Sequence, residues 1–149
     1  MKRKKVLFIC TGNTCRSPMA EAIFRSEIKR RKIKFVDAAS AGIFAEKSTA
    51  IHPLSAACLD ELKVDYSKFK PRQLKHKMLE TSYMVVCMTH EQKDLLNGLG
   101  NVYAMRDIVG FDIDDPYGGG IEDYRRAASE IRAAVEKIIE RYFSGGAAE

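Results

Sequence analysis

Nine consecutive residues near the N-terminus combine a thiol, a cation and small polar side chains. They are Cys10, Thr11, Gly12, Asn13, Thr14, Cys15, Arg16, Ser17 and Pro18. Gly12 restricts the backbone little and Asn13 tolerates a left-handed conformation, so neighbouring backbone N–H groups can turn toward one point. Such N–H groups beside a helix N-terminus bind anions, and the planar guanidinium of Arg16 matches two oxygens of a phosphate. The segment therefore predicts a phosphate-binding loop.

Cys10 lies at the start of this segment, where the loop would hold its anion. Positive surroundings favour the thiolate, which is the nucleophilic form of cysteine, and the Ser17 hydroxyl can donate a hydrogen bond to it. An inert buried thiol is the alternative, but it explains neither the glycine turn nor the polar loop. A nucleotide-binding loop is excluded because the pattern Gly-x-x-x-x-Gly-Lys is absent. We predict a nucleophile inside an oxyanion cradle for a phosphoryl group.

A carboxylate in the second half of the chain is the candidate proton donor. Phosphoryl transfer needs an acid for its leaving group. Asp115 precedes Pro116, Tyr117 and three glycines, directly before the last predicted helix. A nearby phosphate would favour the protonated form of its carboxyl group. From the residues alone, a structural role in the loop, beside Asp112 and Asp114, is equally compatible.

The hydrophobic pattern predicts four strands, and these would position the loop. The apolar run Val6–Ile9 is typical of a strand buried on both faces of a parallel sheet. Further strands are expected over residues 35–40, which Gly42 ends, over 83–88 and over 101–105. Cys10 then follows the carboxyl end of the first strand, where open parallel sheets bind their ligands.

Segments with helical spacing separate these strands. One helical pattern opens at Pro18, a second at Pro53, and a third at Thr89, which forms a capping box with Gln92. A long amphipathic stripe runs from Ile121 to Tyr142, with Ser144-Gly145-Gly146 ending the helix. Alternating strands and helices predict the α/β class, as a three-layer α/β/α sandwich with a central four-stranded parallel sheet and the phosphate-binding loop after the first strand.

Composition sets the broad class of protein. The chain has 149 residues, is 46% hydrophobic and 30% charged, and carries a formal net charge of +5, so we expect one domain over residues 1–149. No run of 18 apolar residues exists, and the four cysteines follow no export signal. We therefore expect a cytoplasmic protein with reduced thiols and no membrane contact. Basic residues cluster at 2–5, 29–32 and 68–77, but no nucleic-acid-binding motif accompanies them, so no nucleic-acid partner is expected.

The two motifs together resemble the low-molecular-weight protein phosphatase family. Cys10-x5-Arg16-Ser17 near the N-terminus, a late Asp115-Pro116-Tyr117 and an intervening Ser40-Ala41-Gly42 carry the resemblance over essentially the whole chain. It implies that Cys10 forms a phosphocysteine, that Arg16 holds the phosphoryl oxygens, and that Asp115 protonates the leaving atom and then activates water. Ser17 would tune the thiolate, while Asn13 and Ser40 hold the loop in shape. The resemblance implies no metal or organic cofactor, phosphorylated proteins or peptides as substrates, and a monomer.

Thr14 bears on which phosphorylated residue is the substrate. Tyrosine-directed members of the family usually carry an aliphatic residue there, whereas the loop from Cys10 to Glu21 resembles that of bacterial protein-arginine phosphatases. The strand end Cys87-Met88-Thr89-His90, and Tyr117 followed by glycines, also resemble that branch. A threonine hydroxyl can orient water or a polar guanidinium leaving group, and Tyr117 would help to select the substrate. We favour phosphoarginine, with phosphotyrosine as the alternative.

The other cysteines and the histidines have simpler interpretations. In the family, a neighbour such as Cys15 can form a reversible disulfide with the nucleophile, although small apolar packing is an equal alternative. Core packing is expected for Cys58 and Cys87, and arsenate reduction is not expected because no further cysteines follow the third strand. No ligand pairs have zinc-site spacing, and His52, His76 and His90 are interpreted as helix-start or surface residues.

Overall fold

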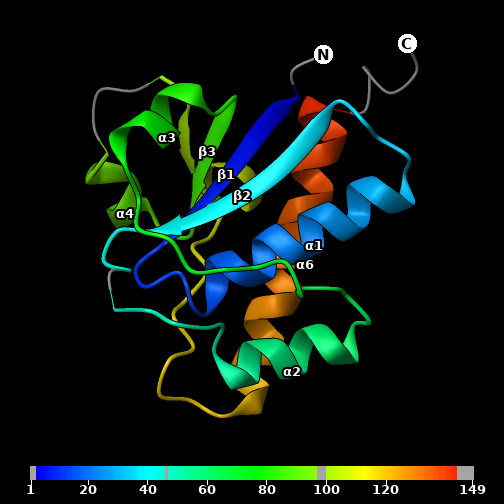
Figure 1. Ribbon diagram of the computed structural model, residues 1–149, viewed down its shortest axis with the longest axis vertical. Coiled ribbons are helices and arrows are strands. Elements are labelled where there is room, and N and C mark those ends of the chain that lie inside the picture. The colour runs from blue at the N-terminus through cyan, green and yellow to red at the C-terminus, as the bar shows by residue number, and fades with distance from the viewer. Residues whose placement is uncertain (1–2, 46, 97–99, 144–149) are drawn as a thin grey trace.

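Four parallel strands form the centre of the computed structural model, which describes residues 3–45, 47–96 and 100–143. They are β1 (Lys4–Cys10), β2 (Val36–Gly42), β3 (Met84–Cys87) and β4 (Val102–Ala104). Their order in the sheet is β2-β1-β3-β4, with Val6 of β1 opposite Ala38 on one side and Met84 on the other (Figure 1). Because β1 is an inner strand with helices near both faces, its apolar run is fully buried.

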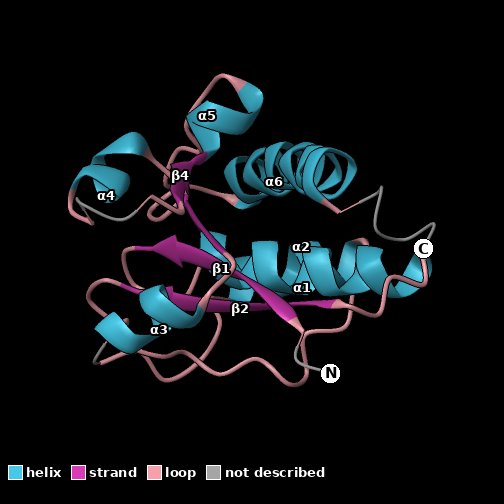
Figure 2. Ribbon diagram, turned by 90° about the horizontal axis from the view of Figure 1, so that it is seen from above, coloured by secondary structure: helices cyan, strands magenta, loops and turns pink. Residues whose placement is uncertain are grey.

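Helices complete the predicted three-layer α/β/α sandwich, which is confirmed. One face of the sheet carries α1 (Arg16–Arg30) and α6 (Ile121–Tyr142), and α2 (Pro53–Glu61) packs on those two helices (Figure 2). The other face is covered by α3 (His76–Thr81) together with Leu74 and Leu96 of neighbouring segments. Two short helices, α4 (His90–Asp94) and α5 (Met105–Val109), flank β4.

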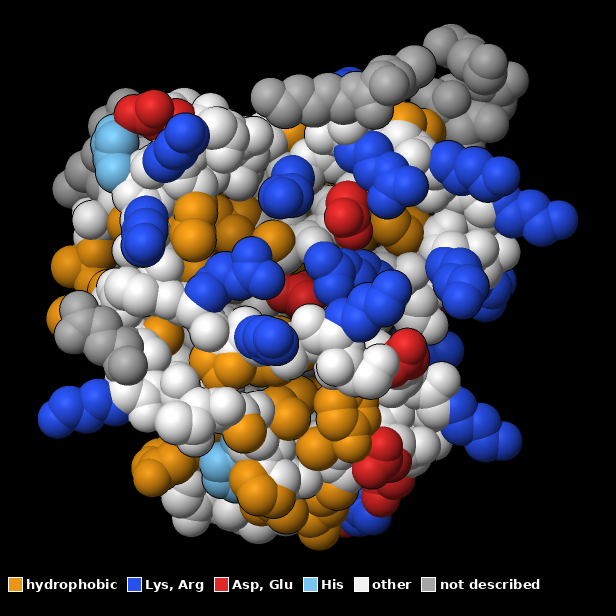
Figure 3. Space-filling view, in the orientation of Figure 1, with side chains coloured by type: hydrophobic (Ala, Val, Ile, Leu, Met, Phe, Trp, Pro, Cys, Tyr) orange, Lys and Arg blue, Asp and Glu red, His pale blue; other side chains and the backbone are white. Residues whose placement is uncertain are grey.

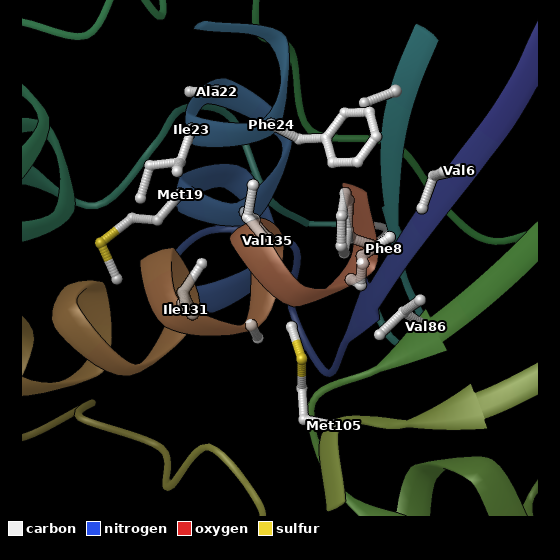
Figure 4. Close-up of a cluster of buried hydrophobic side chains, with 14 of the residues drawn as sticks. Val6, Phe8, Met19, Ala22, Ile23, Phe24, Val86, Met105, Ile131 and Val135 are labelled. Atoms are coloured by element: carbon white, nitrogen blue, oxygen red, sulfur yellow. The ribbon is translucent and has the colours of Figure 1, made fainter. Parts of the chain in front are cut away.

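Alternation along β1 divides the core into two clusters. Val6, Phe8 and Cys10 face α1 and α6 in the larger cluster, where Phe8 packs edge-on against Phe24 at 5.7 Å between ring centroids (Figure 4). Leu7 and Ile9 face the smaller cluster on the α3 side. Cys10 thus ends the strand with its side chain on the α1 side of the sheet.

Most predicted elements are present, with shifted boundaries. The first helix begins at Arg16, so Pro18 lies within its first turn rather than opening it. The second begins at Pro53 as predicted, and Thr89 forms both hydrogen bonds of the capping box with Gln92, at 3.2 and 3.3 Å. The long helix spans Ile121–Tyr142, and its predicted end at Ser144-Gly145-Gly146 lies outside the described residues.

The strand expected over residues 101–105 is too long. Only Val102–Ala104 pair with β3, and Met105 instead begins α5. Neither α5 nor α3 was predicted, because helices of five or six residues show too few turns for a hydrophobic period to emerge. Among the described residues, none of the helices has both the length and the apolar character that crossing a membrane requires.

Candidate active site

The loop between β1 and α1 folds over the end of β2. Asn13 adopts a left-handed backbone with φ of 56°. The loop approaches Gly42 so closely that a Cβ there would lie 2.7 Å from the Thr11 carbonyl oxygen and 2.8 Å from the Asn13 nitrogen. Gly42, which ends β2, therefore allows the loop to approach this closely, because any side chain at this position would push the loop away.

The Asn13 side chain holds this conformation through three hydrogen bonds. Its amide nitrogen donates to the hydroxyls of Ser17 at 2.8 Å and Ser40 at 2.9 Å, and its carbonyl oxygen accepts from the Arg72 backbone nitrogen at 2.9 Å. Asn13, Ser17 and Ser40 are all fully buried. A buried polar cluster is stable only when its groups are paired, and these bonds provide that pairing.

Cys10 lies at the floor of the loop, 2% exposed, with its Sγ 2.8 Å from the Ser17 hydroxyl. The Ser17 oxygen already accepts from Asn13, so its own hydrogen is available for the sulfur. Donation in this direction stabilises a thiolate more than a thiol. That Ser17 tunes the thiolate stays a prediction.

Arg16 reaches from the first turn of α1 toward the loop that carries Asp115. Its Nη1 donates to the Ile113 carbonyl oxygen at 2.8 Å, and its Nη2 lies 3.7 Å from Asp115 Oδ2. Its Nε is buried and has no hydrogen-bond partner among the described residues. An unpaired buried guanidinium N–H beside a cavity is suited to an anionic oxygen.

Asp115 lies on the opposite wall with about half of its side-chain surface exposed, at 53%. Its Oδ1 accepts from the Tyr117 backbone nitrogen at 3.0 Å, which leaves Oδ2 directed toward Arg16. The loop then turns through a 2.9 Å bond from the Gly119 nitrogen to the Pro116 carbonyl oxygen. The arrangement places a carboxylate beside the guanidinium.

One cavity of about 240 Å³ brings the predicted residues together. Its lining residues are Cys10, Thr11, Gly12, Thr14, Cys15, Arg16, Asp115 and Tyr117. Asn13, Ser17 and Ser40 do not line this cavity but are hydrogen-bonded to one another, and Ser17 also contacts Cys10; their role in supporting the loop stays a prediction. Among the described residues, no group of three His, Cys, Asp or Glu side chains is arranged to hold a metal ion.

The domain model for "Low molecular weight phosphotyrosine protein phosphatase" matches residues 5–143. The chain belongs to this family. It is therefore a phosphoprotein phosphatase, a hydrolase, and the resemblance drawn from its motifs is confirmed.

Relatives in the family are named for two different substrates. A Bacillus subtilis "Protein-arginine-phosphatase" is 30% identical over 144 residues, covering 91% of this chain and 95% of the relative. A Staphylococcus epidermidis "Low molecular weight protein-tyrosine-phosphatase PtpB" is 34% identical over 140 residues, covering 90% and 96%. The solved structure of the YwlE arginine phosphatase, a cysteine-to-serine mutant with a phosphorylated active-site serine, superposes with a TM-score of 0.85. It is 28% identical and covers 93% of this chain and 97% of its own.

Cys15 is a buried residue of the phosphatase loop, 6% exposed. Its Sγ is 3.5 Å from the buried Tyr124 hydroxyl and 3.8 Å from the Thr14 hydroxyl. Burial raises the pKa of the Cys15 thiol, and the hydrogen bonds from Tyr124 and Thr14 only partly oppose this. Cys10 and Cys15 are both free in this structure, and a disulfide between them stays a prediction.

The remaining cysteines and the histidines lie as predicted. Cys58 and Cys87 are buried in the core, and burial raises the pKa of Cys87 to about 12. His52 is the N-cap of α2, where its Nδ1 accepts from the Leu54 nitrogen at 3.1 Å. His76 begins α3 on the surface, and His90 begins α4.

Three supporting residues were missed by the sequence reasoning. Glu21 Oε1 accepts from the Ser40 hydroxyl at 2.7 Å, and Gln92 Nε2 donates to the Thr11 hydroxyl at 3.2 Å. The His52 ring stacks on Tyr124 at 4.9 Å between centroids. Glu21 could have been found from the sequence, because it shares a helical face with Phe24 and Ile28. A glutamate on the buried face of a helix needs a polar partner. The other two contacts join distant segments and have no local signal.

Proposed function

We propose that the chain hydrolyses phosphorylated side chains of proteins through a phosphocysteine on Cys10. The observation that supports this most directly is the shared cavity, in which the Cys10 thiol, the Arg16 guanidinium and the Asp115 carboxylate face the same space. A nucleophile, a cation and an acid suffice for phosphoryl transfer to water.

In the first step the Cys10 thiolate attacks phosphorus. The S–P bond forms as the bond from phosphorus to the substrate nitrogen or oxygen breaks, and the leaving atom takes the electron pair. Asp115, entering as the carboxylic acid, transfers its proton to that atom. The Ser17 hydroxyl, 2.8 Å from the sulfur, holds the thiolate in place before attack.

In the second step Asp115, now a carboxylate, takes a proton from water. The water oxygen attacks phosphorus, the S–P bond breaks, and Cys10 leaves as a thiolate with release of inorganic phosphate. Arg16 binds the equatorial oxygens in both steps through Nε and Nη2, the two guanidinium nitrogens not used by Ile113. We expect the backbone N–H groups of the loop to share this charge stabilisation.

Phosphoarginine is the substrate that we propose. Thr14 lines the cavity and contributes a hydroxyl group to it. An aliphatic side chain at this position would instead favour the flat phenol ring of phosphotyrosine. The relative named a protein-arginine phosphatase supports this assignment, as does the YwlE structure. Tyr117, 72% exposed on the cavity wall, gives a flat face on which a guanidinium can stack.

Phosphotyrosine is the second candidate, and the same Tyr117 face favours it, because a phenyl ring also stacks there. The relative at 34% identity is named a tyrosine phosphatase. The test is hydrolysis of matched phosphoarginine and phosphotyrosine peptides by wild type, Thr14→Ile and the control Thr14→Ser. We expect wild type and Thr14→Ser to prefer phosphoarginine and Thr14→Ile to shift at least about tenfold toward phosphotyrosine. A wild-type preference for phosphotyrosine would overturn the arginine assignment and leave the mechanism intact.

We further propose that residues 1–149 work as one phosphatase domain, monomeric and cytoplasmic, with no metal or organic cofactor. Every group that the two steps require is supplied by Cys10, Arg16, Asp115 and the loop itself. Unchanged turnover after extensive chelation, and a mass in solution equal to one chain, are the expected results.

A further inference from the structure

Lysine and arginine side chains gather on the face of the molecule made by α1, β2 and residues 63–72 (Figure 3). Two hollows lie on this face. One, of about 610 Å³, is lined by Arg3, Arg25, Ile28, Lys29, Lys32, Ile33, Lys34, Val36, Asp37, Lys68 and Arg72. The other, of about 360 Å³, shares Arg25, Lys29 and Lys68 with it, so the two are continuous. We call the larger hollow, with this junction, the basic groove.

Among the described residues, six of the seven cations that line the basic groove make no direct ion pair, and only longer-range attractions connect Asp65 with Lys29 and Lys68 and Glu21 with Arg72. Arg25 is the exception, since it pairs with Glu21 at 3.0 Å and with Asp37 at 3.3 Å. The other cations of the groove make no ion pair with any carboxylate in the described part of the chain: Arg3, Lys29, Lys32, Lys34, Lys68 and Arg72. Six like charges around one hollow repel one another and attract an anionic chain.

The floor of the basic groove is aliphatic. Ile28, Ile33 and Val36 lie beneath the charged rim, each less than 9% exposed. None of the described residues lining the larger hollow is aromatic, and Tyr66 and Phe69 line only the smaller one, whereas single-stranded nucleic acid is gripped by stacking its bases on aromatic rings. Because Ile28, Ile33 and Val36 are only 1% to 6% exposed, a partner contacts mainly the cationic rim, which fits an acidic peptide segment.

The groove lies beside the start of β2, and the backbone of one of its residues reaches the catalytic loop. Lys34, Val36 and Asp37 line the groove at the start of the strand, and Arg72 lines it as well, while the Arg72 carbonyl oxygen accepts from the nitrogen of Gly42, at the end of the strand, at 2.9 Å. The Arg72 nitrogen in turn bonds to Asn13 of the catalytic loop.

We infer that the basic groove binds an extended acidic segment of the protein substrate, with carboxylates on its cationic rim. This inference rests on the proposed function, because it takes the bound protein to be the one whose phosphorylated side chain enters the cavity. Docking of this kind raises affinity for the substrate without touching the reacting atoms.

Binding of a short labelled peptide of alternating Glu and Leu, followed by fluorescence anisotropy, tests the groove directly. The variant Lys29→Glu/Lys32→Glu/Lys68→Glu reverses three exposed rim charges, and Lys75→Glu/Lys77→Glu/Lys137→Glu makes the same change in net charge outside the groove. We expect the groove variant to bind at least about tenfold more weakly and the control variant to match wild type within about threefold. Equal weakening in both variants, or tighter binding of a charge-matched single-stranded oligonucleotide than of the peptide, would overturn the inference.

Turnover separates this inference from the proposed function. A phosphopeptide extended by the same acidic segment should show a higher KM in the groove variant with kcat unchanged, while p-nitrophenyl phosphate should be hydrolysed equally by all three proteins. An unchanged KM for the extended phosphopeptide contradicts docking. A wild type that binds the acidic peptide but hydrolyses no phosphate ester contradicts the proposed function alone.

Discussion

The two walls of the catalytic cavity are built in opposite ways. The loop between β1 and α1 is held from behind by hydrogen bonds, with the buried Asn13 side chain bonded to Ser17, to Ser40 and to the backbone of residue 72. The facing wall, with Asp115 and Tyr117, is exposed, and a single bond from its own backbone orients the carboxylate. From this difference we infer that the β1–α1 loop is the rigid wall, which binds the phosphoryl group. The exposed wall with Asp115 and Tyr117 transfers the proton and contacts the substrate.

The largest effect should follow removal of the nucleophile from the rigid wall. We expect Cys10→Ser to lower kcat by at least about 10⁴-fold, because serine forms its anion far less readily than cysteine. Melting temperature should change little, since the substitution retains a small group bonded to Ser17. Steady-state kinetics with p-nitrophenyl phosphate measures this, and residual activity near wild type would exclude Cys10 as the nucleophile.

The exposed wall should lose activity without losing stability. Asp115→Asn retains the acceptor for the Tyr117 nitrogen but cannot give up a proton, so we expect kcat to fall about 10²- to 10³-fold. The free energy of unfolding should change by less than about 0.5 kcal/mol. Asp114→Asn, also exposed, is the matched control and should retain full activity. Equal losses in both variants would show that the loop's charge, rather than an acid at Asp115, matters.

The rigid wall should lose stability and activity together. Asn13→Ala removes three hydrogen bonds and places alanine in a left-handed conformation, which we expect to destabilise the protein by about 2 to 3 kcal/mol and to lower kcat about tenfold or more. Asn13→Gly removes the same bonds but accepts the backbone, so it should recover part of the stability and little of the activity. Chemical denaturation of both variants measures the loss of stability, and steady-state kinetics measures the loss of activity. Full activity in Asn13→Gly would mean that backbone shape alone, without the bonds, maintains the site.

The smallest predicted effect concerns the carboxyl group of Glu21, which lies behind the rigid wall. Burial raises the pKa of Glu21 above its usual 4.5, against the opposing effects of Ser40 and Arg25. A raised folded-state pKa contributes stability that is complete below the unfolded value and is lost as pH rises through the folded value. The unfolding free energy of wild type, minus that of Glu21→Gln, should therefore fall by about 1 kcal/mol or less as pH rises from below 4.5 toward neutrality.

Urea denaturation of both proteins across this pH range measures the difference. If the difference instead grew with pH, the ion pair with Arg25, at 3.0 Å, would outweigh the burial of the Glu21 carboxylate. The support behind the loop would then depend on charge rather than on neutral hydrogen bonds.

The same contrast explains what could be predicted from sequence. The phosphate-binding loop is contiguous, so Cys10, Asn13 and Arg16 revealed its shape through residue types and spacing alone. The capping box of Thr89 with Gln92 was predictable for the same reason. Asp115 was ambiguous, because only tertiary structure places it 3.7 Å from Arg16, 99 positions away in a different loop. Its assignment needed the resemblance to a family.

Features made by distant segments escaped prediction. The basic clusters near residues 29–32 and 68–77 were visible, but only the fold shows that they face each other beside β2. The bond from Gln92 to Thr11 likewise joins two strand ends that become neighbours only in the sheet. The chemistry of the phosphate-binding loop could be predicted from local sequence, whereas the residues that face this loop are brought there by tertiary packing.

Trapping of the phosphoenzyme tests the central claim most directly. Asp115→Asn mixed with p-nitrophenyl phosphate, whose leaving group needs little protonation, should release p-nitrophenol in a burst and then stall, because water attack lacks its base. Rapid quenching and peptide mapping by mass spectrometry should find a phosphoryl group on Cys10. A phosphoryl group on any other residue, or steady hydrolysis with no burst and no modified peptide, would contradict the phosphocysteine mechanism.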